Sequence, residues 1–269
     1  MKSILVSGGN SGIGLQAARE FVAQGHRVAI LGRDRHKGEQ AVRPLGGRAT
    51  FHSVDLSTHD GVRDAAKRVL DEHEHLDAVL HTTGVMTFED VRTADGLNLF
   101  FAVNYLSRYH LTQLLLPALR RAERARVVMM TAHVSLATTI DLQVFPGFES
   151  FHFGRMREQV QIGNHHYAAY LARTEPGLLA GVVNAGGAKT DIFRMQPWYF
   201  RLLATAVIPA FYGSVTKAAH NAVHASVRDD WPAATYWEKP GNFDRRTSIA
   251  LDESTTHHVM DVSRKLTGA

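Results

Sequence analysis

The stretch Ile4-Leu5-Val6-Ser7-Gly8-Gly9-Asn10-Ser11-Gly12-Ile13-Gly14 decides the fold of this chain. Its apolar start predicts a short β-strand, and its glycines predict a tight turn that lets the backbone approach a ligand closely. Residues 15–24 have helical spacing, and the first turn of such a helix offers N–H groups and the positive end of the helix dipole. This order of strand, glycine-rich turn and helix is typical of a site that binds the pyrophosphate of a dinucleotide.

Strand-like runs alternate with helical patterns up to residue 184. Strands are predicted at 4–7, 27–31, 50–54, 78–81, 126–131 and 180–184, and helices at 15–24, 38–43, 62–73, 100–121 and 164–173. This alternation predicts a parallel sheet, and right-handed crossovers make such a sheet doubly wound. Because no linker divides the chain, we expect one α/β domain over residues 1–269, a Rossmann fold with helices on both faces of a single sheet.

Composition excludes several classes of function. The 30 Lys and Arg residues against 26 Asp and Glu give a net charge of +4, but they are spread along the chain, so we expect no nucleic-acid partner. The chain has no cysteine and no HExxH spacing, so we expect no metal site. The start of the chain is too short in apolar length for a signal peptide, and Arg201 and Pro209 interrupt the apolar stretch at 198–211. We therefore expect a soluble cytoplasmic protein without membrane contact, and the sequence leaves a homo-oligomer open.

Several motifs, in order along the chain, resemble those of the short-chain dehydrogenase/reductase family, and its retinol-dehydrogenase-like branch most of all. They are the opening stretch above, Val54-Asp55-Leu56, His81-Thr82-Thr83-Gly84-Val85-Met86, Ala102-Val103-Asn104-Tyr105-Leu106, Ala185-Gly186 with Thr190, and Ser263-Arg264-Lys265-Leu266-Thr267-Gly268. The resemblance implies a nicotinamide dinucleotide as cofactor. It also implies that Asp55 contacts the adenine and that Thr190 contacts the nicotinamide amide or the pyrophosphate.

The residue at the end of the second predicted strand bears on which dinucleotide binds. An acid there would accept hydrogen bonds from the ribose 2′-OH and repel a 2′-phosphate, but the chain has Gly32 followed by Arg33. A guanidinium can bind a phosphate with two parallel hydrogen bonds, so Arg33 favours NADP(H). Asp34 keeps NAD(H) as the alternative, although it lies past the strand end between Arg33 and Arg35.

The catalytic residues of the family are only partly matched. Members usually transfer hydride with an Asn, a Ser and a Tyr-x-x-x-Lys pair, in which the Lys lowers the pKa of the Tyr. Asn104 matches the Asn, and the Ser falls on Ala132. Counting back from the helix that follows the pair places the Lys on Gln161 and the Tyr on Arg157.

A second register is anchored on Ala185-Gly186 and places the Tyr near Arg155. No Tyr-x-x-x-Lys occurs anywhere in the chain, so the usual mechanism is in doubt. Histidine titrates near neutrality, and His133 follows the fifth predicted strand, which makes it the preferred candidate beside Asn104 for a catalytic role. His165, His166, Tyr167 and Tyr170 are further candidates on the next helix.

The expected cofactor-binding residues are Gly8, Asn10, Ser11, Gly12, Ile13, Gly14, Arg33, Asp55, Leu56, Thr83, Gly84, Gln161 and Thr190. The segment at 191–213 is rich in large apolar residues, and the resemblance makes it a substrate lid. Such a lid implies a bulky apolar substrate, while core packing or an oligomer contact is the other interpretation.

The sequence therefore predicts an atypical NADP(H)-dependent oxidoreductase that acts on a bulky apolar carbonyl or alcohol. A non-redox enzyme on the same scaffold, such as a cyclase, isomerase or lyase, is one alternative. A protein that binds the cofactor without catalysis is the other, because fold alone does not choose among them.

Overall fold

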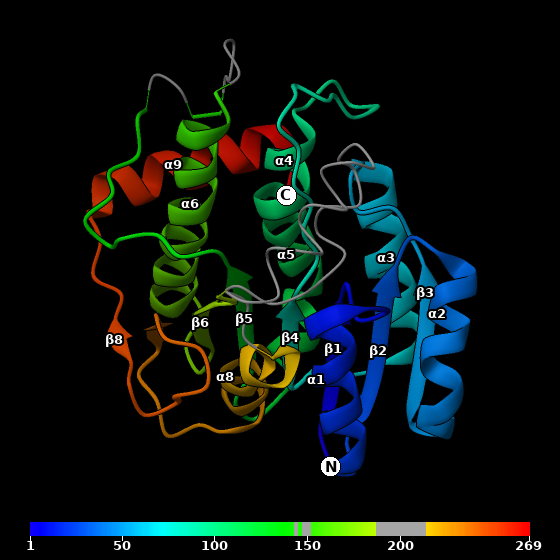
Figure 1. Cartoon of the computed structure of the whole chain (residues 1–269). Helices are drawn as coiled ribbons and strands as arrows, with labels where there is room; N and C mark the ends of the chain where they lie inside the picture. Colours follow the sequence, from blue (N-terminus) through cyan, green and yellow to red (C-terminus); the bar gives the residue numbers. More distant parts are fainter. Residues whose placement is uncertain (143–144, 147–151, 187–213) are drawn as a thin grey trace.

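The central strands are apolar on both faces, which suits a sheet buried between two layers of helices. In the computed structural model, which describes residues 1–142, 145–146, 152–186 and 214–269, eight strands form one sheet in the order β3-β2-β1-β4-β5-β6-β7-β8 (Figure 1). They are β1 Ser3–Ser7, β2 Arg27–Gly32, β3 Ala49–Ser53, β4 Ala78–His81, β5 Arg126–Thr131, β6 Leu179–Asn184, β7 Ala234–Trp237 and β8 Thr247–Ser248. Only β8 pairs antiparallel among these strands, so the predicted doubly wound Rossmann fold is confirmed.

Helices cover both faces of the sheet. They are α1 Gly12–Ala23, α2 Arg35–Val42, η1 Arg43–Arg48, α3 His59–Glu72, α4 Leu99–Phe101, the π-helical η2 Ala102–Leu106, α5 Ser107–Leu119, α6 Phe153–Thr174, α8 Val215–Val227 and α9 Glu253–Thr267. On one face α1 packs beside α8, and α3, α5 and α6 cover the other, with α9 against α6 (Figure 1). Because side chains of a strand alternate, Ile4 and Val6 of β1 join the core under α1 and α8, while Leu5 joins the opposite core.

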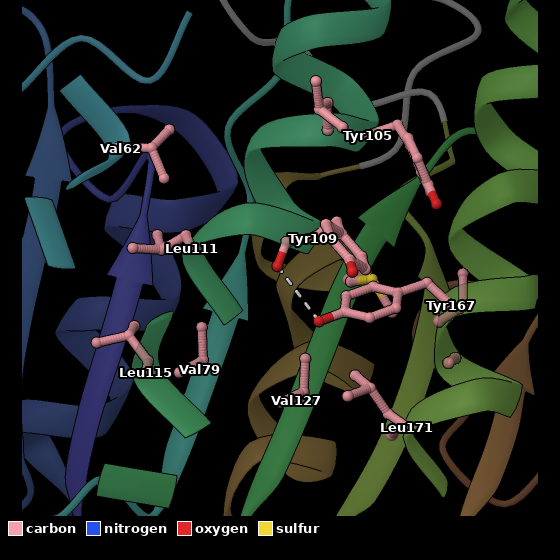
Figure 2. Close-up of a cluster of buried hydrophobic side chains, with 14 of the residues drawn as sticks. Val62, Val79, Tyr105, Tyr109, Leu111, Leu115, Val127, Tyr167 and Leu171 are labelled. Carbon is pink, nitrogen blue, oxygen red and sulfur yellow. Dashed lines mark hydrogen bonds between the residues drawn. The ribbon is translucent and has the colours of Figure 1, made fainter. Parts of the chain in front are cut away.

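The core between the sheet and helices α5 and α6 contains three buried tyrosines, Tyr105, Tyr109 and Tyr167 (Figure 2). The rings of Tyr109 and Tyr167 lie 5.0 Å apart, and the Tyr167 hydroxyl donates a hydrogen bond to the backbone oxygen of Tyr109 at 3.3 Å. That hydroxyl also accepts from Nε2 of Gln113 at 3.1 Å. Tyr167 is therefore part of the packing between α5 and α6.

The structure extends the predicted elements in three places. Helix α6 begins at Phe153, well before the expected start at Asn164, and the expected continuous helix at 100–121 is interrupted by the π-helix η2. Strands β7 and β8 and helix α8 were not predicted. The expected lid at 191–213 and Thr190 lie outside the described residues. Among the helices of the described part of the chain, none has the length and apolar character needed to cross a membrane.

Candidate active site

The glycine-rich turn between β1 and α1 forms a cradle too narrow for side chains. A Cβ on Gly8 would lie 2.7 Å from the backbone nitrogen of Thr83, and one on Gly14 would lie 2.5 Å from the backbone oxygen of Gly8. Gly8 also has a φ of 79°, which favours glycine. No side chain caps the first turn of α1, whose N-cap residue is Ser11. These backbone N–H groups fit the phosphates of a dinucleotide.

A cleft with a cavity volume of about 320 Å³ opens along the carboxyl ends of the parallel strands. Among the sequence-predicted residues that line it are Gly8, Asn10, Ser11, Gly12, Ile13, Gly14, Arg33, Asp55, Leu56, Thr83, Gly84, Asn104 and Gln161. His133 is absent from the lining formed by the described residues.

The end of the cleft over β2 and β3 carries Arg33, which is exposed and has no hydrogen bond from its guanidinium to any described residue. Its neighbour Asp34 caps α2, because its Oδ1 accepts from the backbone nitrogen of Lys37 at 2.9 Å. An acid cannot replace Gly32 without movement, since a Cβ there would lie 2.6 Å from Cγ of Asn10. Among the described residues, the end of β2 therefore presents the guanidinium of Arg33 and no carboxylate other than the one that caps α2.

The opposite end of the cleft is built around Asn104 in the π-helix η2. Its Nδ2 donates to the backbone oxygens of Phe100 and Val85 at 2.9 and 3.1 Å, and its Oδ1 accepts from the Val85 nitrogen at 3.2 Å. The backbone oxygen of Asn104 accepts from Nδ2 of Asn164 on α6 at 3.1 Å. Asn104 thus fixes the loop after β4, and its carbonyl joins η2 to α6.

Arg157 and Gln161 of α6 both line this end, whereas the alternative Tyr position, Arg155, is exposed and outside the described lining. Of the two sequence registers, the one based on Arg157 and Gln161 is therefore the one that has both positions at the cleft. Oε1 of Gln161 accepts from the backbone nitrogen of Ala132 at 3.3 Å. The adjacent Thr131 hydroxyl lines the cleft and is buried without a hydrogen-bond partner among the described residues.

His133 lies beside this end of the cleft, with its side chain 55% exposed. Its Nδ1 is 3.3 Å from the Tyr236 hydroxyl and 3.8 Å from a carboxylate oxygen of Glu238. Its backbone oxygen accepts from the guanidinium of Arg157 at 3.4 Å. His133 therefore neighbours a residue of the cleft wall and is open to solvent.

Three of the four candidates on α6, His165, His166 and Tyr167, are buried. Burial lowers the pKa of His165 and His166 to about 4 in each case, so both are neutral near pH 7. His166 Nδ1 lies 2.7 Å from the hydroxyl of Thr256 on α9, and the ring of His165 packs edge-on against Tyr236. Tyr167 is buried in the core, away from the cleft.

Sequence reasoning missed Arg108, a cleft-lining residue one turn beyond Asn104. A charged residue within the apolar stretch at 102–119 was the available signal. Its guanidinium donates to the backbone oxygen of Thr83 at 2.9 Å and to Oδ1 of Asn164 at 3.2 Å.

Comparison with known proteins identifies the family of this chain. The family model described as short chain dehydrogenase matches residues 2–145. The chain belongs to the short-chain dehydrogenase/reductase family. A short-chain dehydrogenase/reductase of Armillaria gallica is 31% identical over 80% of this chain and 75% of its own length. Mouse retinol dehydrogenase 12 is 29% identical over 85% of this chain and 74% of its own, so the chain is close to the retinol-dehydrogenase branch.

Solved structures share the fold of this dehydrogenase/reductase. An uncharacterised protein from Mycobacterium paratuberculosis superposes with a TM-score of 0.77 at 23% identity, over 100% of this chain and 94% of that one. Salutaridine reductase from Papaver somniferum superposes with a TM-score of 0.70 at 18% identity, over 88% and 100%. Membership of this oxidoreductase family implies a nicotinamide cofactor, NAD or NADP.

Proposed function

We propose that this chain is an NADP(H)-dependent oxidoreductase that acts on a bulky apolar carbonyl or alcohol without the usual Tyr-Lys pair. The observation that carries the proposal is the cleft end at Arg33. The guanidinium there is free to bind a 2′-phosphate, while the carboxylate of Asp34, the candidate for an NAD-type acid, caps α2.

The substrate class is supported by the opposite end of the cleft. Val85, Met86, Phe100 and Val103 line it with apolar surface. A mouse relative is named a retinol dehydrogenase, and retinol is a bulky apolar alcohol. An apolar wall of this kind binds an apolar substrate by excluding water.

Several residues have proposed roles around the bound cofactor, which supplies or accepts the hydride. The α1 N-terminus holds the pyrophosphate, Asp55 and Leu56 hold the adenine, and Thr190 contacts the cofactor amide or pyrophosphate. Gln161 hydrogen-bonds the ribose at the nicotinamide end. Asn104 shapes this end of the cleft, and His133 is the group proposed to exchange the proton with the substrate oxygen, because it is accessible and adjacent to Arg157.

The test is to incubate the protein and NADPH with a panel of apolar aldehydes and ketones. The reaction is monitored by the absorbance of the reduced nicotinamide. We expect NADPH to be consumed in step with product formation. His133→Gln should lower turnover about 100-fold. The control is His36→Gln, an exposed position on α2 that is distant in sequence from His133, and it should not change turnover. Bound NADPH that no carbonyl consumes would contradict the proposal.

The pair Arg157 and Gln161 is the reason for the two alternatives, a non-redox enzyme on this scaffold and a cofactor-binding protein without catalysis, which the family comparisons do not favour. Neither side chain can replace a phenol of lowered pKa as an acid/base, which suits a non-redox reaction or cofactor binding without catalysis. In that case product would form without consumption of NADPH, or no product would form at all.

A further inference from the structure

Arg108 is an arginine buried at the wall of the cleft. It is 4% exposed, and its two acceptors among the described residues, the Thr83 backbone oxygen and Oδ1 of Asn164, are both uncharged. Its Nε is buried and has no hydrogen-bond partner among the described residues. The guanidinium is therefore incompletely satisfied by the part of the protein that the structure describes.

No described carboxylate forms an ion pair with Arg108. The contrast is Arg126, which is also buried but has a carboxylate oxygen of Asp229 at 3.7 Å. Burial lowers the pKa of Arg108 to about 9, so the group remains charged at neutral pH. A buried cation without a counter-ion is costly to the fold, and such groups concentrate at functional sites.

The position of Arg108 assigns it to one half of the cleft. Thr83 follows β4, and Asn164 lies one turn beyond Gln161 on α6. In a sheet of this order a dinucleotide lies across the strand ends, with adenosine toward β2 and β3 and nicotinamide toward β5 and β6. Arg108 therefore lies in the nicotinamide half, together with Asn104, Gln161 and Arg157. Of the two arginines in this half, Arg108 is buried and Arg157 is partly exposed to solvent, which screens its charge.

We propose that Arg108 supplies the positive charge that the neutral Gln161 does not, and that this charge makes the cleft bind the reduced cofactor more tightly than the oxidised one. The inference rests on the proposed function. Oxidised nicotinamide is a cation and reduced nicotinamide is neutral, whereas the phosphates and the adenosine are the same in both forms. A buried cation in a region of low dielectric constant therefore disfavours only the oxidised ring.

The experiment is a calorimetric titration of the full chain with NADPH and with NADP⁺. In the unmodified protein we expect NADPH to bind about tenfold more tightly or better, by the Coulomb repulsion of two partly buried charges. Arg108→Met should reduce the ratio of the two dissociation constants about tenfold, and Arg108→Lys should largely preserve it. Arg33→Ala is the matched control, because it should weaken the binding of NADPH and of NADP⁺ equally. The ratio of the two dissociation constants should then stay unchanged.

Equal dissociation constants for the two forms in the unmodified protein would overturn the inference without reliance on any variant. An unchanged ratio in folded Arg108→Met would also overturn it, and Arg108 would then act only as a clamp between the β4 loop and α6. If the unmodified protein binds neither form, the proposed function fails together with the role of Arg108. If it binds both forms but without the expected ratio, only the role of Arg108 fails.

Discussion

The hydroxyl of Tyr167 shows how a residue's surroundings decide its role. The side chain is fully buried, and its hydroxyl donates to the backbone oxygen of Tyr109 (Figure 2). The same hydroxyl accepts from Nε2 of Gln113. Burial raises the pKa of this phenol well above its usual range, which makes it a poor acid near neutral pH.

Tyr167→Phe should therefore lower the free energy of unfolding by about 1 kcal/mol, because one buried hydrogen-bonding hydroxyl is lost. It should leave cofactor affinity and turnover unchanged. Urea denaturation and the carbonyl assay measure the two effects, with the less buried Tyr170→Phe on the same helix as the control. A large loss of turnover at unchanged stability would instead indicate that Tyr167 acts as a proton donor.

At the scale of elements, Asn164 connects α6 to the π-helix η2. Its Nδ2 donates to the backbone oxygens of Asn104 and Val160 at 3.1 and 2.7 Å, and its Oδ1 accepts from Arg108. The side chain is fully buried, so water cannot replace these partners.

Asn164→Ala should lower the free energy of unfolding by about 3 kcal/mol, since it removes three buried hydrogen bonds and leaves Arg108 with one acceptor fewer. Thr174→Ala, at the exposed end of the same helix, should change it by less than about 0.5 kcal/mol. Chemical denaturation of both variants measures the difference. Similar stabilities would show that the contact does not hold α6 against η2.

The sequence predicts the local elements better than the long-range ones. The first strand, the glycine turn and the sheet up to β6 follow from apolar runs and glycine spacing. A Cβ on Gly8 or Gly14 would collide with the loop that follows β4. Strand β7 is only four residues long, and η2 differs from an α-helix by hydrogen bonding that periodicity does not encode. The burial of Arg108 depends on contacts with α6 and with the loop after β4, which are distant from it in sequence. The local sequence around Arg108 therefore does not predict that this side chain is buried.

At the scale of the whole molecule, buried histidines make stability depend on pH. Burial lowers the pKa of His110, His165 and His166 to about 4, and burial followed by the charge of Arg108 lowers that of His81 to about 3. An unfolded chain protonates these groups near pH 6.5, whereas the folded chain does not. Their contribution to stability is therefore complete above pH 6.5 and is lost as the pH falls toward 4.

Urea denaturation between pH 8 and pH 4 should show constant stability at the upper end and a steep loss below about pH 6.5. His166→Gln should make that loss shallower, because one of the groups that take up a proton on unfolding is removed. A flat profile between pH 6.5 and pH 4 would contradict this account of the buried histidines.

The most direct test of the central claim is calorimetric titration of the purified protein with NADPH, NADP⁺, NADH and NAD⁺. We expect the phosphorylated pair to bind more tightly. Arg33→Ala should weaken that pair about 10- to 100-fold, by loss of a charge-assisted contact to phosphate, while the neighbouring Arg35→Ala, whose side chain pairs with Glu39, should not. Equal affinity for all four dinucleotides would contradict the NADP(H) assignment, and absence of binding at millimolar concentration would contradict a cofactor site in this cleft.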